Sequence, residues 1–176
     1  MKKKLSKKTI SPKLNFRTVY LSFGSNVNNR KRNIEKALSE LAKNNINQIK
    51  ISSYYKTSPV GPKQRDFYNL AGKFKTSLSP KELLKFLKEI EINLGRTRNY
   101  KWGPRIIDID ILFYGNIIVR EKNLTIPHKE IQNRIFVLQP LNEISPAFVH
   151  KIYKKQIKTL LKSASARFKD TAIKIF

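Results

Sequence analysis

An alternation of aspartate and isoleucine in the middle of the chain limits the fold most strongly. From Arg105 to Tyr114 the sequence reads RIIDIDILFY, with isoleucine at 107, 109 and 111. Residues two apart point the same way in a strand, but not in a helix. The segment is therefore predicted to be a strand that buries its isoleucines on one face and holds Asp108 and Asp110 together on the other.

Two adjacent carboxylates suggest a cation site. Ionised carboxylates that lie close together repel each other, so a cation between them would stabilise the pair. Mg²⁺ typically takes one or two carboxylates and completes its shell with water and substrate phosphate. Arginines and a lysine precede the strand, and guanidinium groups bind phosphate oxygens in pairs. This combination favours phosphoryl transfer; an ordinary amphipathic strand with two solvated acids is the alternative.

The remaining pattern predicts an α+β domain. Alternating apolar residues predict strands at Thr18–Phe23, Gln48–Lys56 and Phe67–Lys75. Helical spacing predicts helices at 29–41 and 80–94, the second capped by a Ser79–Glu82 capping box. The resulting order, β-α-β-β-α-β, is typical of a ferredoxin-like fold, an antiparallel sheet with helices packed on it. A C-terminal extension follows, in which apolar residues from Ile157 to Ala164 predict an amphipathic helix.

The net charge of +25 is concentrated at the two ends. Residues 1–17 contain seven Lys or Arg and no acid, and residues 151–176 contain eight and one acid. We expect a basic flexible arm at 1–17, a catalytic domain at 18–150 and a partly helical basic tail at 151–176. Basic surfaces attract polyanions, so an RNA-binding ferredoxin-like module without catalysis is the alternative function. The aromatic RNA-binding strands of such modules are missing from the sequence.

Other classes are excluded by composition. The chain has no cysteine, which rules out disulfides, thiol catalysis and thiolate metal sites. No apolar run reaches the roughly 18 residues that a membrane-spanning helix needs. No Walker A motif is present. We expect a cytoplasmic protein without a membrane partner.

The segment Lys101–Leu112 (KWGPRIIDIDIL) resembles the signature of the hydroxymethyldihydropterin pyrophosphokinases. That signature is a basic residue, any residue, Gly-Pro-Arg, two residues, and then Asp-aliphatic-Asp-aliphatic-aliphatic. The similarity runs from about Val19 to Val149 and includes FGSN at 23–26, SYYKTSPVGP at 53–62, FYN at 67–69, GRTR at 95–98, LTIPH at 124–128 and NRIFVL at 133–138.

The resemblance implies transfer of diphosphate from ATP to 6-hydroxymethyl-7,8-dihydropterin, with release of AMP, in folate biosynthesis. It implies two Mg²⁺ ions as cofactors and ATP as co-substrate. These small molecules are the expected partners of a monomer, and no nucleic acid is expected.

The resemblance also implies roles for particular residues. Asp108 and Asp110 match the metal ligands, and together with Arg96 and Arg105 they form the expected catalytic set. The residues that match pterin contacts are Thr57, Val60, Phe67, Asn69, Trp102 and Phe136. Those that match ATP contacts are Arg98, Trp102, Arg105, Ile111, Thr125, His128 and Arg134. Independently of the resemblance, Phe67 and Asn69 are expected on one strand face, where one can stack and the other can form hydrogen bonds.

Some positions depart from the family pattern. Asn123 stands where many members have arginine, and Lys129 replaces an aromatic residue. The loops after Pro62 and Gly95 are each one residue shorter than in well-known bacterial members. These differences concern ATP binding and loop motion rather than the pair of aspartates.

Overall fold

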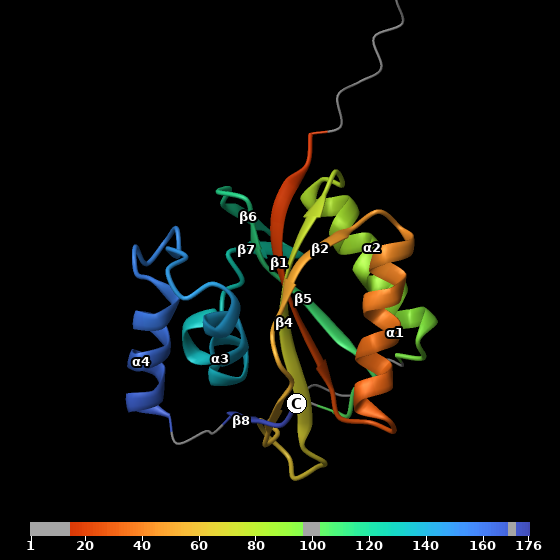
Figure 1. The fold of residues 1–176 in the computed structure, drawn as a ribbon, viewed down its shortest axis with the longest axis vertical. Coiled ribbons are helices and arrows are strands. Elements are labelled where there is room, and N and C mark those ends of the chain that lie inside the picture. The colour runs from red at the N-terminus through yellow and green to blue at the C-terminus, as the bar shows by residue number, and fades with distance from the viewer. Residues whose placement is uncertain (1–14, 97–102, 169–171) are drawn as a thin grey trace, which may run out of the picture.

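A six-stranded antiparallel sheet lies at the centre of the fold (Figure 1). The computed structural model describes residues 15–96, 103–168 and 172–176. The strands follow the order β5-β1-β4-β3-β8, and β2 pairs with the distal half of β4. Their bounds are β1 Arg17–Ser25, β2 Asn47–Ile51, β3 Tyr55–Thr57, β4 Phe67–Thr76, β5 Asp108–Tyr114 and β8 Ala172–Lys174. Strands β6 (Val119–Glu121) and β7 (Leu124–Ile126) form a separate hairpin.

Helices cover both faces of this sheet (Figure 1). Helices α1 (Arg30–Lys43) and α2 (Pro80–Asn93) lie on one side, and α3 (Ile135–Ile144) and α4 (Ile157–Arg167) lie on the other. A short 3₁₀ turn, η1 (Ile131–Asn133), precedes α3. The mixed α/β architecture with an antiparallel sheet and four described helices agrees with the sequence-based expectation at this level.

The predicted start of α2 is confirmed. The Ser79 hydroxyl accepts from the backbone N–H of Glu82, and the Glu82 carboxylate accepts from the N–H of Ser79. This reciprocal pair satisfies two N–H groups that a helix start otherwise leaves without partners. Leu83, Leu87 and Ile90 then form the buried stripe of the helix.

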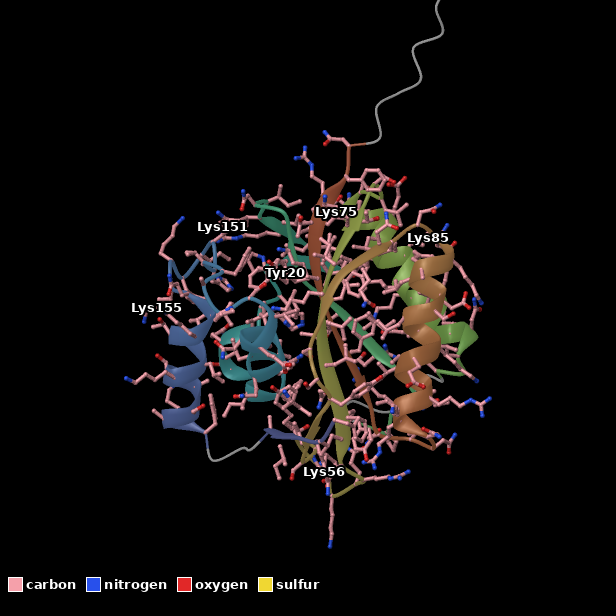
Figure 2. The ribbon with its side chains drawn as sticks, in the orientation of Figure 1. Tyr20, Lys56, Lys75, Lys85, Lys151 and Lys155 are labelled. Atoms are coloured by element: carbon pink, nitrogen blue, oxygen red, sulfur yellow. The ribbon has the colours of Figure 1, made fainter. Side chains whose placement is uncertain are left out.

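Alternation along the strands builds a separate core on each face of the sheet. On β1, Val19, Leu21 and Phe23 pack with Ile109 and Ile111 of β5 beneath α1 and α2. Tyr20 points to the other side, where its ring meets Phe113 and Phe148 beside α3. Figure 2 shows Tyr20 inside the molecule, while Lys56, Lys85 and Lys155 project outward at the rim.

The prediction of a single strand at Gln48–Lys56 is wrong in one respect, because a break divides this segment into β2 and β3. Ser52 is buried and bonds with Ala71 through both its backbone N–H and its hydroxyl. The backbone N–H and hydroxyl of Ser53 instead donate to the Glu143 carboxylate of α3. Serine side chains can replace sheet hydrogen bonds in this way, which interrupts the strand.

The expected strand Arg105–Tyr114 also begins later, at Asp108. Arg105 exchanges two hydrogen bonds with Asn26, which follows β1: its N–H donates to Asn26 Oδ1, and its carbonyl accepts from the Asn26 N–H. These bonds hold Arg105 outside the ladder.

The C-terminal region contributes more than the predicted helix. Helix α4 buries Ile157, Leu160 and Ala164 beside α3, and the chain then returns to the sheet as β8. The expected arm at 1–17 falls almost wholly outside the described residues. Within the part of the chain that the structure describes, no helix combines the length and apolarity needed to cross a membrane.

Candidate active site

The floor of the site is a row of residues across three neighbouring strands. Gly24 of β1 pairs with Asn69 of β4 on one side and with Asp108 of β5 on the other. Directly opposed residues in an antiparallel sheet share a face. Because strands lie about 4.8 Å apart, Asn69 and Asp108 stand about 10 Å apart across the glycine. The next row has the same orientation and contains Asp110 opposite Ser22.

This row lies on the α3 face of the sheet. Further along the same face, Tyr20, Ala71 and Leu112 are covered by α3. Toward the other end the apolar residues give way to polar ones and to Gly24, and a cavity of about 630 Å³ opens there. The sheet therefore uses half of one face for its core and leaves the other half for a site.

The carboxylate of Asp108 lies between two guanidinium groups. Its Oδ1 is 2.8 Å from Arg96 Nη1, and its Oδ2 is 2.7 Å from Arg105 Nη1. Burial alone would raise the pKa of this carboxyl, but the charges of Arg105 and Arg96 hold it below its ordinary value. Asp108 is therefore ionised at neutral pH, as a metal ligand must be.

The buried carboxylate of Glu91 in α2 belongs to the same network of charges. Its carboxylate accepts from the backbone N–H of Ile109 at 2.7 Å and forms ion pairs with Lys88 and Arg96. Burial raises its pKa, while these partners act in the opposite direction. Glu91 thus ties α2 to β5 and places Arg96 beside Asp108.

Asp110 faces a second pair of basic groups. Its Oδ2 lies 3.6 Å from Arg134 Nη1 and 3.9 Å from His128 Nε2. His128 Nδ1 accepts from the N–H of Glu130, so the neutral ring carries its proton on Nε2. Burial lowers the pKa of His128, although Asp110 partly opposes this effect. At neutral pH the imidazole is an uncharged donor beside Asp110.

The opposite end of the cavity carries the Asn69 amide. Asn69 is buried, and its Nδ2 donates to Thr57 Oγ1 at 2.8 Å. Its Oδ1 faces Gly24, where an added Cβ would come within 3.0 Å. The rings of Phe67 and Phe136 line the same cavity.

Most of the residues predicted from the sequence meet at this cavity. Those that line it are Thr57, Val60, Phe67, Asn69, Arg105, Asp108, Asp110, Arg134 and Phe136. Arg96 and His128 reach it through Asp108 and Asp110. Arg98 and Trp102 lie outside the described residues.

Two predicted ATP contacts are not brought to the cavity. Ile111 is 4% exposed and packs in the core beneath α1 and α2, on the face opposite the aspartates. The alternation that places Asp108 and Asp110 on one face necessarily turns Ile111 away. Thr125 lies in the β6–β7 hairpin and does not line the cavity either.

Several residues at the site were missed from the sequence. Glu91 could have been found, because it is an acid next to the apolar stripe of α2. Gly24 and Asn26 belong to the FGSN segment of the resemblance but were not predicted as site residues. Asn26 bonds with Arg105 and with the loop residues Gln64 and Arg65. Phe168 also lines the cavity, and no signal in the sequence connects it to the site.

The residues present suit Mg²⁺. Two carboxylates, hard oxygen donors, project from alternate positions of one strand into the cavity. No set of three or more His, Cys, Asp or Glu that could hold a metal occurs among residues 15–96, 103–168 and 172–176.

Known proteins are similar to this chain in sequence and in fold. The family model described as 7,8-dihydro-6-hydroxymethylpterin-pyrophosphokinase (HPPK) matches residues 20–146. The 2-amino-4-hydroxy-6-hydroxymethyldihydropteridine pyrophosphokinase of Aquifex aeolicus is 44% identical over 142 residues, which cover 80% of this chain and 88% of that protein. The bifunctional protein FolKE of Lactococcus lactis subsp. cremoris is 51% identical over 129 residues, or 72% of this chain.

The match to FolKE spans only 37% of that protein's length. A solved structure of HPPK-DHPS from Plasmodium falciparum aligns with a TM-score of 0.74 at 19% identity and covers 90% of this chain and 46% of that one. At this identity the likeness concerns the fold. The RNA-binding alternative has no support from any of these relatives. The family match and the identity to full-length relatives together show that this chain belongs to the 7,8-dihydro-6-hydroxymethylpterin-pyrophosphokinase family.

Proposed function

We propose that this chain transfers diphosphate from ATP to the hydroxymethyl group of 6-hydroxymethyl-7,8-dihydropterin, with release of AMP, as a step of folate biosynthesis. The observation that carries the proposal is the cavity floor, where Asn69 and Asp108 flank Gly24 on neighbouring strands. One end is suited to a flat polar heterocycle and the other to metal and phosphate. Relatives named as pyrophosphokinases support the same reaction.

The pterin is proposed to bind at the Asn69 end. The bond from Asn69 Nδ2 to Thr57 fixes the amide and leaves Oδ1 directed at the middle of the floor. That oxygen can accept a hydrogen bond from the amino-pyrimidine edge of a pterin. Phe67 and Phe136 offer flat apolar surfaces for stacking, and Val60 and Trp102 remain proposed contacts.

The nucleotide is proposed to bind at the aspartate end. Asp108 and Asp110 would hold two Mg²⁺ ions, which when bound supply positive charge against the phosphate oxygens. Arg105 and Arg134 line the same wall and can each engage phosphate oxygens through two N–H groups. Neutral His128 can donate from Nε2. Arg96 and Arg98 remain proposed contributors.

The reaction needs positioning and charge neutralisation more than a strong base. The pterin hydroxyl oxygen attacks the β-phosphorus of ATP and forms a new O–P bond. The bond from that phosphorus to the oxygen bridging the α- and β-phosphates breaks, and AMP leaves with this oxygen. The hydroxyl proton passes to water. The chain's own part is to hold the two substrates in line along the floor.

Finer features are also proposed. The order β5-β1-β4 with β2 and β3 alongside supports a ferredoxin-like core. We also propose a basic arm at residues 1–17, a catalytic domain at 18–150 and a basic tail at 151–176. A monomer is proposed as the active unit. A cytoplasmic location, where ATP is available, is proposed with it.

The reaction is tested by mixing the purified chain with ATP, Mg²⁺ and the pterin substrate and measuring AMP. We expect AMP and the pterin diphosphate in equal amounts. Omission of the pterin, or chelation of the metal, should abolish both products. ADP in place of AMP, or AMP formed at the same rate without the pterin, would contradict the proposal.

A further inference from the structure

Strand β8 places the end of the chain beside the pterin end of the cavity. The strand order runs from β5, which carries the aspartates, to β8 at the opposite edge of the sheet. Ala172 of β8 pairs with Thr57, the residue that holds Asn69. Figure 1 shows β8 at this edge of the sheet. The segment lies beyond the family match, which ends at residue 146.

Phe168, at the end of α4, forms part of the cavity wall. Its backbone N–H donates to Ala164, the last hydrogen bond of that helix. Its ring packs against the core beneath α3 and α4 and also lines the cavity that contains Thr57, Phe67 and Phe136. It therefore adds an aromatic side chain to a cavity that Phe67 and Phe136 also line.

Strand β8 is fastened to the molecule by several independent contacts. The backbone of Tyr54 exchanges two hydrogen bonds with the chain end, from Ile175 N–H and to the Phe176 oxygen. The Phe176 ring meets the rings of Tyr54 and Tyr68 at 5.2 Å and 5.8 Å.

An ion pair adds a further contact. Lys174 Nζ lies 3.5 Å from the carboxylate of Glu143, which also accepts from Tyr55. The edge strand therefore ties Thr57 and its neighbours to α3.

We propose that Phe168 is a substrate-binding residue that contacts the pterin ring and that β8 acts as a clamp positioning Thr57. This inference rests on the proposed function. The aromatic side chain of Phe168, which lines the cavity together with Phe67 and Phe136, should contribute to pterin affinity and leave nucleotide affinity unchanged. Without the clamp, the Thr57 hydroxyl would no longer fix the orientation of the Asn69 amide, so pterin binding should weaken in the same selective way.

The test measures two dissociation constants in the full-length protein by calorimetry. The first is for Mg²⁺ with an ATP analogue whose α- and β-phosphorus atoms are joined by carbon. The second is for 6-hydroxymethyl-7,8-dihydropterin in the presence of that analogue. Phe168→Ala should weaken pterin binding roughly ten-fold, the loss of about one aromatic contact. Analogue binding should stay within about two-fold, and Phe168→Tyr should restore pterin binding.

Phe176→Ala tests the clamp, with Ile173→Ala as its matched control. Phe176 follows β8, and its ring meets those of Tyr54 and Tyr68. Ile173 lies within β8 and is 58% exposed, so its truncation should leave both constants unchanged. Phe176→Ala should weaken pterin binding selectively. The inference is overturned if Phe168→Ala leaves pterin affinity unchanged, or weakens the binding of pterin and analogue equally. The proposed function still stands in that case, provided that the wild-type protein turns over normally. A folded wild-type protein that binds the analogue but no pterin overturns both.

Discussion

At the scale of single residues, Gly24 is where the two halves of the site meet. Its Cα lies between Asn69 and Asp108, and it has no side chain to obstruct a substrate on the floor. An added Cβ would lie 3.0 Å from Asn69 Oδ1 and 3.7 Å from the Phe67 ring. The glycine is needed here for close approach rather than for an unusual backbone conformation.

Gly24→Ala should therefore displace Asn69 by a few tenths of an ångström. We expect the KM for the pterin to rise roughly ten-fold, less than the 10²-fold that a 1 Å misplacement can cost, with a smaller effect on the KM for ATP. Steady-state kinetics with each substrate varied in turn measures this.

Gly72→Ala is the matched control for this prediction. It adds a Cβ against the Phe74 ring on the opposite face, so it should lower Tm without a selective change in the KM for the pterin. If the KM for the pterin is the same in Gly24→Ala as in the wild-type protein, the added Cβ does not displace Asn69, and the prediction is contradicted.

At the scale of elements, the break between β2 and β3 joins the sheet to α3. Glu143 accepts hydrogen bonds from the N–H and hydroxyl of Ser53 and from the hydroxyl of Tyr55. Desolvation would raise the pKa of Glu143, but hydrogen bonds from Tyr55 and Ser53 and the charge of Lys174 lower it below the ordinary value. The charged carboxylate is therefore the form that holds these elements together.

Glu143→Ala should destabilise the protein by roughly 1–3 kcal/mol, because it leaves partly buried donors without their acceptor. Urea unfolding followed by circular dichroism measures this change. Glu40→Ala is the control, since Glu40 lies on the exposed side of α1 and pairs only locally with Lys43. A Glu143 variant as stable as the Glu40 variant would contradict this role.

The existence of these elements could be predicted from the sequence, but some of their boundaries could not. Period-two and helical patterns are local, so β1, β4, α1 and α2 are found where they were expected. The break between β2 and β3 depends on Glu143, which bonds with Ser53 from ninety residues away. The late start of β5 depends on Asn26, which lies after β1. Such distant partners leave no periodic signal in the segment itself.

The same distinction applies to the site. The aspartate pair, Phe67 and Asn69 lie at alternate positions of single strands, so their shared faces follow from the strand period. That Phe136 and Arg134 join them was expected only from the family resemblance. Phe168 comes to the cavity through the path of α4 and β8, which local sequence does not encode.

At the scale of the whole molecule, a buried histidine couples stability to pH. His150 is 1% exposed, and its Nδ1 accepts from the N–H groups of Ile152 and Tyr153. Its ring packs against those of Phe113 and Tyr153. Burial lowers the pKa of His150 to about 4.

The unfolded chain therefore takes up this proton more readily than the folded protein. The stabilisation is fully present above the ordinary pKa of about 6.5 and is lost as the pH falls toward 4. We expect a loss on the order of 3 kcal/mol across this window. Urea midpoints between pH 7 and pH 4 measure it, and His150→Asn should flatten the slope. An identical slope in that variant would exclude His150 as the cause.

The account as a whole depends on the role of Asp110. It is proposed to hold Mg²⁺ against the ATP phosphates and to make no contribution to pterin binding. The most direct measurement is the single-turnover rate of AMP formation by Asp110→Ala at saturating ATP, Mg²⁺ and pterin. Glu121→Ala is the control, because this exposed strand carboxylate pairs with Lys81 outside the cavity. We predict a loss on the order of 10³-fold or more for Asp110→Ala, as for removal of a metal clamp, with pterin affinity unchanged. A rate within a few-fold of the control would contradict the assignment of the aspartate pair.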